Sequence, residues 1–271
     1  MKGKQEKKGW HAIVPELASA ERWGVIVVGA GGNGCQMIAG LAQMHRAMIE
    51  LGHPGGLAVR VYDDDIVSEA NVGRQLYSLA DVGINKAIVS VNRVNLFYGL
   101  DWEAVPQRFP VAQSGISYHC RPANAARVHI LISCVDTAAA RRSIHQAIWK
   151  ARHEAPLYWL DMGNGKHDGQ VILGQPESGL KGGGEIARLP CVTDLFPDLL
   201  DDDFQEDDTP SCSLAEALAH QDLFINRAVS TFALELLWTL FRQGGLGYHG
   251  AFVNLASGLV NPLKAGGERR G

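Results

Sequence analysis

One short segment, Gly29-Ala30-Gly31-Gly32-Asn33-Gly34, constrains the fold more than any other part of this sequence. It follows a brief apolar run over residues 24–28 and precedes a helix-like pattern over residues 34–51, with Gly52 after it. Glycines at positions 29, 31 and 34 permit a tight turn, and they let backbone N–H groups and the helix dipole approach a phosphate. The segment predicts a buried parallel strand, a glycine turn and a helix. Alone, it is common to many nucleotide-binding proteins.

The alternation of strands and helices continues along the chain. We expect strands over residues 57–62, 128–135, 157–160 and 170–173, and helices over residues 86–98 and 138–152. Gly99 is expected to stop the first helix, and Thr137 to cap the second. The pattern indicates the α/β class: a Rossmann-like, mostly parallel sheet with helices on both faces. Ligands bind at the carboxyl ends of strands in such sheets.

Most of the chain is expected to form a single domain over residues 10–265, between disordered tails at 1–9 and 266–271. Residues 174–211 include a glycine-rich stretch and an acidic run over residues 198–208, so we expect a long, mobile, solvated crossover loop. A long C-terminal helix is expected over residues 214–243, stopped by Gly244 and Gly245.

Composition excludes several classes of protein. The net charge of −4 gives no reason to expect nucleic-acid binding, and no stretch reaches the roughly 18 apolar residues that a membrane span needs. Five cysteines, an odd number with no Cys-x-x-Cys pair, argue against a disulfide framework and a four-thiolate zinc site. We expect a cytoplasmic protein with neither a nucleic-acid nor a membrane partner.

Polar residues gather after the strand over residues 57–62. Asp63 is placed to hydrogen-bond the hydroxyls of a ribose, and a dehydrogenase would need no further polar residue in this segment. This chain adds more groups, and a guanidinium and an ammonium suit a triphosphate better than a nicotinamide ring. Asn71 and Arg74, three residues apart, share a face if their segment is helical. The added groups are Asp65, Asn71, Arg74, Gln75 and Lys86.

Asp136 directly follows the apolar strand over residues 128–135. A carboxylate at this place could simply cap the next helix. It could also bind Mg²⁺, which prefers hard oxygen ligands shared with phosphate oxygens. The glycine turn, Asp63 and Asp136 thus lie at three strand ends that converge on one edge of the predicted sheet.

With these motifs in view, the chain resembles the E1-like ThiF/MoeB superfamily of enzymes that activate ubiquitin-like proteins, and most closely the ThiF-type proteins of the PRTRC plasmid cassette. The resemblance runs from about residue 24 to residue 136 and continues more weakly to the last helix. It implies a Rossmann-like fold, usually dimeric. It also implies that MgATP adenylates the C-terminal glycine of a small ubiquitin-like protein and that pyrophosphate is released.

The resemblance also implies roles for individual residues. Asp63 would hold the ribose, and Asp136 would bind Mg²⁺. Asn71, Arg74 and Lys86 would hold the triphosphate and stabilise the charge that develops as pyrophosphate leaves. Such catalysis works by positioning and electrostatics and needs no general base, because the attacking carboxylate is already ionised. The predicted nucleotide site as a whole comprises Gly29, Gly31, Gly32, Gly34, Asp63, Asp65, Asn71, Arg74, Gln75 and Lys86.

Cysteines and one arginine depart from the pattern of the superfamily. Related proteins often hold zinc with two Cys-x-x-Cys pairs, whereas Cys191 stands alone here, so no structural zinc is expected. Cys212 precedes a capping-box sequence at residues 213–216, where a helix dipole would lower the pKa of its thiol. It is either a second-step acyl acceptor or an inert loop cysteine. Arg22 lies in no Arg-x-x-Arg-Gln motif, the element through which related enzymes reach the ATP of the partner subunit.

The sequence therefore predicts an ATP-dependent adenylyltransferase for the C-terminal carboxylate of a small ubiquitin-like or sulfur-carrier-type protein. Two alternatives stay open. A catalytically degenerate relative would bind nucleotide or a partner as a module of a plasmid-borne system. An NAD-dependent oxidoreductase would bind NAD and not ATP.

Overall fold

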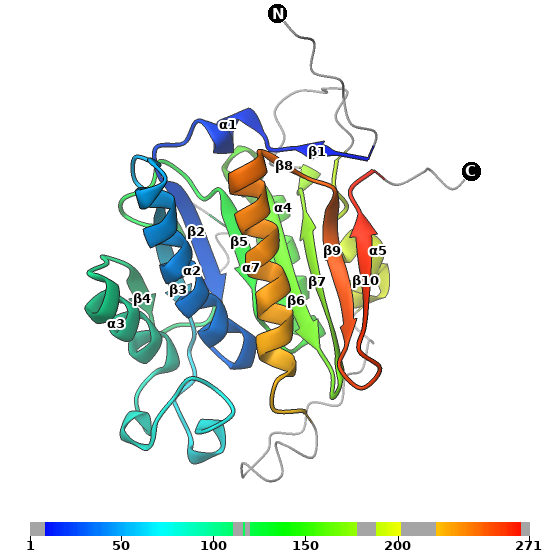
Figure 1. Ribbon diagram of the computed structural model, residues 1–271. Coiled ribbons are helices and arrows are strands. Elements are labelled where there is room, and N and C mark those ends of the chain that lie inside the picture. The colour runs from blue at the N-terminus through cyan, green and yellow to red at the C-terminus, as the bar shows by residue number, and fades with distance from the viewer. Residues whose placement is uncertain (1–8, 111–115, 117–119, 178–187, 202–220, 267–271) are drawn as a thin grey trace, which may run out of the picture.

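The computed structural model describes residues 9–110, 116, 120–177, 188–201 and 221–266 (Figure 1). The predicted tails therefore fall almost wholly outside the described residues, and so do Cys212 and most of the acidic run. Within the described part, no helix is long and apolar enough to cross a membrane.

A central β-sheet carries helices on its two faces (Figure 1). Among the described residues it has eight strands, in the order β10-β9-β7-β6-β5-β2-β3-β4, and a separate ribbon joins β1 to β8. The strands are His11–Ala12 (β1), Trp23–Val28 (β2), Leu57–Tyr62 (β3), Glu103–Val105 (β4), Ile130–Ser133 (β5), Tyr158–Asn164 (β6), Asp168–Gly174 (β7), Gly245–Leu246 (β8), Tyr248–Asn254 (β9) and Leu259–Lys264 (β10). The helices are Pro15–Ala18 (α1), Gly32–Glu50 (α2), Lys86–Tyr98 (α3), Ala138–Ala151 (α4), Val192–Leu195 (α5) and Ile225–Gln243 (α7), with 3₁₀ turns at Glu69–Asn71 (η1), Leu79–Asp81 (η2), Arg152–Glu154 (η5) and Pro197–Leu200 (η7).

The part of the sheet built from β4, β3, β2, β5 and β6 is parallel. From β2 the chain passes through α2 to β3 on one side, and it later returns to β5 on the other side of β2. The chain thus changes direction at β2, and such a switch point leaves a crevice beyond the carboxyl ends of the neighbouring strands. The predicted convergence of the β2, β3 and β5 ends is confirmed.

The other part of the sheet is antiparallel, with β7, β9 and β10 added beside β6. The strand predicted over residues 170–173 is present and runs over Asp168–Gly174, whereas β9 and β10 were not predicted. The prediction of a mostly parallel sheet is still confirmed, because the parallel part contains more strands than the antiparallel part.

Two hydrophobic cores lie on opposite faces of the sheet. Strand β2 supplies both, since Val25 and Val27 join the core beneath α2, α3 and α7, while Ile26 and Val28 join the core beneath α4 and α5. Alternate side chains of a strand point to opposite faces, so a strand buried on both sides reads as a continuous apolar run. The helices predicted for both faces are confirmed (Figure 1).

The front face in Figure 1 is covered chiefly by α2 and α7, which lie side by side. Gly40 of α2 allows this close approach, because a Cβ built there would lie 2.1 Å from Leu234 Cδ1 of α7. The packing fixes the first turns of both helices near the carboxyl end of β2.

Helix boundaries mostly agree with the sequence. Helix α3 ends as expected at Gly99, and the Thr137 side chain caps α4 by accepting a hydrogen bond from the Ala140 N–H. The prediction of one continuous helix over residues 214–243 is wrong, because residues 221–224 are not helical and α7 begins at Ile225. The predicted crossover loop contains α5 and η7; its mobility stays a prediction.

Candidate functional site

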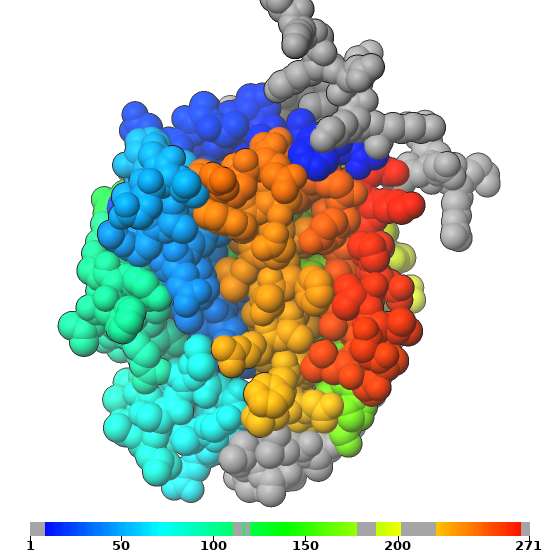
Figure 2. All heavy atoms as spheres, viewed as in Figure 1, coloured from blue at the N-terminus to red at the C-terminus, as the bar shows by residue number. Residues whose placement is uncertain are grey.

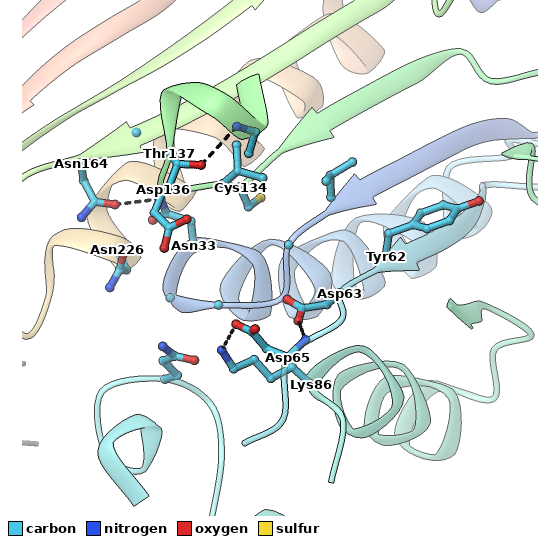
Figure 3. Close-up of a pocket in the computed structure, with 18 of the residues that line it drawn as sticks. Asn33, Tyr62, Asp63, Asp65, Lys86, Cys134, Asp136, Thr137, Asn164 and Asn226 are labelled. Carbon is cyan, nitrogen blue, oxygen red and sulfur yellow. Dashed lines mark hydrogen bonds and ion pairs between the residues drawn. The ribbon is translucent and has the colours of Figure 1, made fainter. Parts of the chain in front are cut away.

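A cleft of about 780 Å³ opens at the carboxyl ends of β2, β3, β5 and β6. The glycine turn between β2 and α2 lies at its centre (Figure 3). Asp63, Asp65 and Lys86 lie on one side of this turn, and Asp136 and Asn226 lie on the other (Figure 3).

Three glycines of the turn are needed for structural reasons, whereas Gly31 is not. Gly29 has φ +92°, which side chains rarely tolerate. A Cβ at Gly34 would lie 1.9 Å from the carbonyl oxygen of Gly29, and one at Gly32 would lie 2.5 Å from Asn226 Nδ2. A Cβ at Gly31 would meet nothing within 4 Å, so the backbone is open to a ligand at this position. Gly34, predicted as a nucleotide contact, packs the helix against the strand and does not line the cleft.

Asp63 fixes the shape of the turn from the end of β3. Its Oδ2 accepts a hydrogen bond from the Ala30 N–H at 2.5 Å, and its Oδ1 accepts one from the Asp65 N–H at 2.8 Å. The side chain is buried, and this burial raises the pKa of the Asp63 carboxyl, while the bond from Ala30 and the charge of Lys86 oppose the rise. Asp63 lines the cleft as predicted, and both of its oxygens already hold backbone groups.

Lys86 and Asp65 form an ion pair, with 2.8 Å between Nζ and Oδ2. Lys86 is the first residue of α3 and is buried, whereas Asp65 is exposed. Asn85 caps α3 through the Ile88 N–H and donates its own amide hydrogens to the carbonyl oxygens of Asp63 and Asp65. The cap therefore holds the lysine and both acidic residues in one corner of the cleft.

Asn71, Arg74 and Gln75 line the cleft together, as the sequence predicted. They do not share a helix face, because η1 ends at Asn71 and Arg74 follows the turn at Gly73, whose φ is +85°. The Asn71 side chain accepts a hydrogen bond from the Ser68 N–H, so it closes this short turn as well as facing the cleft. Burial lowers the pKa of the Arg74 guanidinium.

Asp136 lies at the end of β5 and lines the cleft with an exposed side chain. The capping alternative belongs to its neighbour, because Thr137 and not Asp136 caps α4. Asp136 is therefore available to bind a cation. A second acidic group, Asp63, Asp64 and Asp65, has ligand atoms within 4.8 Å of one another, although Asp63 and Asp65 are already engaged as described above.

The lining residues that were not predicted include two groups. One group comprises Tyr62, the last residue of β3, with Arg108 and Phe109, which follow β4; the Tyr62 and Phe109 rings meet edge to face with centroids 5.0 Å apart. The other is a set of carboxamides that comes from α2, β6, β7 and the start of α7. No short motif unites either group, so only the folded chain brings them together. The carboxamides are Asn33, Asn164, Gln170, Gln221 and Asn226.

The predictions for the individual cysteines have different outcomes. Cys35 is buried as expected, whereas Cys134, expected in the core, packs against it and also lines the cleft at the end of β5. Cys212 lies outside the described residues. Helix α7 gives no support to the helix-dipole argument for its thiol, because α7 begins only at Ile225. Cys191 is buried, and burial raises the pKa of its thiol well above the ordinary value.

The polar atoms of the cleft fit a nucleotide with an associated cation. Arg74 Nε, Gln75 Oε1 and Asn33 Oδ1 are buried and have no hydrogen-bond partner among the described residues. Buried polar atoms without partners are costly, so their presence around the open position at Gly31 indicates space for a polar ligand. Lys86 and Arg74 supply positive charge for phosphates, and Asp136 supplies a hard oxygen for a divalent cation.

The sequence pattern of the ThiF family matches residues 12–259. This match covers most of the chain. The chain belongs to the ThiF family. The predicted superfamily is thereby confirmed, while the match does not distinguish the PRTRC member within it.

Known relatives of this ThiF-family chain include the catalytic subunit of the NEDD8-activating enzyme E1 of Caenorhabditis elegans. The two are 26% identical over 207 residues, which is 70% of this chain and 41% of the relative, so the chain spans less than half of that protein.

Solved structures show the same fold. The crystal structure of PaaA matches with a TM-score of 0.55 and 14% identity, over 92% of this chain and 65% of that one. Escherichia coli MccB, crystallised with AMPCPP and MccA, matches with a TM-score of 0.56 and 14% identity, over 94% of this chain and 66% of that one. The chain thus spans slightly less than two thirds of both structures.

Proposed function

We propose that this ThiF-family protein is an ATP-dependent adenylyltransferase that activates the C-terminal carboxylate of a small ubiquitin-like or sulfur-carrier-type protein. The observation that supports this most is the cleft around the glycine turn. It combines an open backbone position at Gly31, the cationic side chains of Arg74 and Lys86, and three buried polar atoms without partners in the described chain. The family match, and the ATP analogue AMPCPP in the crystals of MccB, support a nucleotide as the ligand.

In this proposal the residues act by positioning and charge. Backbone N–H groups near Gly31, with Asn71, Arg74 and Lys86, would hold the triphosphate and stabilise the charge that develops on pyrophosphate. Asp136 would hold Mg²⁺, which neutralises phosphate oxygens when bound. The ionised C-terminal carboxylate of the partner attacks the α-phosphorus, a P–O bond forms to the carboxylate, and the bond to pyrophosphate breaks. No protein group has to remove a proton.

Lys86 must change partners in this scheme. Its ion pair with Asp65 is 2.8 Å long, and the exposed Asp65 can turn towards solvent when a phosphate approaches. Asp63 is predicted to hold the ribose. It would hold the ribose only by sharing oxygens that now accept hydrogen bonds from backbone N–H groups. Each carboxylate oxygen has lone pairs for a second hydrogen bond.

A protein partner is supported by apolar side chains exposed beside the cleft. They lie in the segment over residues 66–84, which Figure 2 shows next to the N-terminal end of α7. Exposed apolar groups that gather in one segment are typical of protein-binding surfaces. The exposed side chains are Ile66 (62%), Leu76 (42%), Leu79 (73%), Val82 (39%) and Ile84 (44%).

The partner we propose ends in glycine, and the protein itself is proposed to be a cytoplasmic homodimer of the PRTRC type.

Cys212 stays a proposed acceptor for the acyl group after adenylation. If the Cys212 thiolate attacks the acyl adenylate, a thioester forms and AMP leaves. The Cys212→Ala variant would then still form the adenylate and lose any thiol-linked adduct.

A degenerate binding module is the second candidate, and one observation favours it. Arg22, the first arginine of the chain, lies directly before β2 and donates to the Gly55 carbonyl oxygen and to Asp101. It thus borders the amino end of β2, whereas the cleft opens at the carboxyl end. An NAD-dependent oxidoreductase is not proposed, since the family match and the two cationic side chains Arg74 and Lys86 favour ATP.

The test is ATP–pyrophosphate exchange, with and without candidate small proteins that end in glycine. Exchange that requires such a partner would establish adenylation and identify the substrate. ATP binding by calorimetry without any exchange would favour the degenerate module, and binding of NAD in place of ATP would contradict both.

A further inference from the structure

Gln221 links the loop that carries Arg74 to helix α7. Its Oε1 accepts a hydrogen bond from Arg74 Nη1 at 2.6 Å and a second from Asn226 Nδ2 at 3.0 Å. Gln221 precedes α7, Asn226 lies in the first turn of α7, and Arg74 lies in the loop between β3 and α3. One amide oxygen therefore connects two segments that are far apart in the sequence.

Asn226 anchors this connection on the glycine turn. It is 3% exposed, and a Cβ at Gly32 would lie 2.5 Å from its Nδ2 and 2.7 Å from its Oδ1. The Asn226 carboxamide thus packs directly on the turn, and its amide group points to Gln221. This contact explains Gly32 without a phosphate, although the sequence had suggested one. The glycine turn, Asn226, Gln221 and Arg74 form one continuous chain of contacts.

The electrical neutrality of Gln221 matters for Arg74. Lys86 is paired with Asp65, whereas the acceptor of Arg74 in the described chain is an amide oxygen and not a carboxylate. A neutral acceptor orients a guanidinium without cancelling its charge. Arg74 Nε, buried and without a partner in the described chain, keeps a hydrogen-bond donor for a ligand. A glutamate at position 221 would hold Arg74 equally well and would neutralise it.

We infer that Gln221 is a positioning residue that orients the Arg74 guanidinium towards the phosphates while leaving its charge free. The inference rests on the proposed function, since it requires a triphosphate in the cleft. It assigns a role to the segment that leads into α7, which no motif in the sequence indicates. A glutamine is required there for two properties, the length that reaches Arg74 and the absence of charge.

The first experiment measures the contact itself, without any nucleotide. Arginine side-chain Nε–Hε resonances are recorded by NMR for the full-length protein and for Gln221→Leu, with Arg74→Lys used to assign the Arg74 signal. We expect the Arg74 resonance to shift and its solvent exchange to accelerate in Gln221→Leu. Gln243→Leu, at the exposed far end of α7, is the matched control and should leave the signal unchanged. An unchanged Arg74 signal in Gln221→Leu would overturn the contact.

The second experiment separates the phosphates from the rest of the nucleotide. Binding of a non-hydrolysable ATP analogue and of AMP is measured by calorimetry for the wild type and for Gln221→Glu. We expect affinity for the ATP analogue to fall about tenfold or more, as for the loss of one charge-assisted hydrogen bond, while AMP affinity stays the same. Gln221→Asn, neutral but shorter, should lose less affinity than Gln221→Glu.

The outcomes distinguish this inference from the proposed function. Equal losses for the ATP analogue and AMP, or no loss for either, would overturn the role of Gln221 towards the phosphates while leaving adenylation standing. If the Arg74 resonance shifts in Gln221→Leu but the wild type binds no nucleotide, the proposed function and the phosphate role are both overturned, and only a structural contact is left.

Discussion

At the scale of single residues, burial separates two carboxylates that the sequence presents as equivalent strand-end acids. Asp63 is buried, and both of its oxygens accept backbone hydrogen bonds, so it holds the glycine turn in shape. Asp136 is exposed in the cleft and leaves the capping of α4 to Thr137. The structure therefore assigns Asp63 a large part in stability, and it leaves Asp136 available to a ligand.

Replacement of Asp136 tests this assignment. Asp136→Asn removes a charge and a hard oxygen ligand while the cap of α4 stays in place, so we expect Mg²⁺-dependent exchange to fall about 100-fold with an unchanged Tm. Exchange is measured across a Mg²⁺ titration. Asp198→Asn, an exposed acid on η7, is the control and should behave as the wild type. Full activity in Asp136→Asn would remove the metal role.

His129 gives a prediction for stability against pH. It is 3% exposed, its Nδ1 accepts the Gly24 N–H at 2.9 Å, and burial together with the charge of Arg127 lowers its pKa to about 4. The unfolded chain has the ordinary histidine pKa and binds a proton first as pH falls. Stability therefore decreases between about pH 6.5 and pH 4, by about 3 kcal/mol from this residue.

The measurement is urea unfolding at pH 7 and at pH 4.5 for wild type, His129→Gln and the control His153→Gln, which alters an exposed histidine. His129→Gln should flatten the acid side of the stability profile, although it lowers stability at pH 7. An equally steep profile in His129→Gln would show that other groups dominate the acid response.

At the scale of elements, the glycine turn between β2 and α2 offers a matched pair of variants. Gly34→Ala places a Cβ 1.9 Å from the Gly29 carbonyl oxygen, so we expect a loss of roughly 2–3 kcal/mol in unfolding free energy and a lower Tm. Gly31→Ala meets no protein atom within 4 Å, so we expect it to lower Tm much less than Gly34→Ala does.

For nucleotide binding, we expect the larger loss in Gly31→Ala, whereas the larger loss of stability is expected in Gly34→Ala. A methyl group at Gly31 occupies the space from which a phosphate would approach the backbone, and we expect about tenfold weaker binding of ATP. Calorimetric affinity and thermal unfolding are measured on both proteins. Normal ATP affinity in Gly31→Ala would show that no ligand approaches the turn at this point.

The residues just before α7 show why the predicted helix over residues 214–243 is not continuous. The capping-box sequence at residues 213–216 predicted a helix from residue 214, but the helix that ends at Gln243 begins at Ile225. Just before it, the Asp222 N–H donates to the Lys166 carbonyl oxygen, and His167 bonds to the Asp222 carboxylate. These contacts hold the residues before α7 in a turn against the β6–β7 hairpin. A local sequence pattern carries no information about this distant partner.

At the scale of the whole molecule, the apolar segment over residues 66–84 and the exposed end of α3 allow the partner surface to be tested. Leu79 (73% exposed) lies in that segment, whereas Phe97 (79% exposed) lies at the C-terminal end of α3, whose N-terminal Lys86 lines the cleft. Leu79→Ser should raise the KM for the protein partner about tenfold and leave ATP affinity unchanged.

Phe97→Ser is the matched control, because it removes an equally exposed apolar side chain away from the cleft. Partner-dependent exchange and sedimentation velocity are measured for both variants. If Phe97→Ser impairs partner use and Leu79→Ser does not, the docking surface lies on α3 and not beside the cleft. A change in sedimentation of Leu79→Ser alone would assign the segment to a homodimer.

The sheet as a whole was predicted only in part. Strands over residues 24–28 and 57–62 are almost wholly apolar, with Arg60 as the exception, because they are covered on both faces. Strand β10 is an edge strand and is exposed along most of its length, with Pro262 within it, so no apolar pattern marks it. Strand β9 depends on β7 and β10 as neighbours, and a single sequence does not reveal that pairing.

The sequence by itself determined the elements and residues whose causes are local. The glycine turn, the acid at the end of β3, the cap at Thr137 and the order Asn71, Arg74, Gln75 and Lys86 follow from backbone geometry and short-range chemistry. Only the tertiary structure decided which of these residues are free and which are engaged, since Asp63 is occupied by the turn and Asp136 is not. It alone also brought Gln221 and Asn226 to Arg74, because a hydrogen bond across 147 residues depends on the packing of α7 against α2.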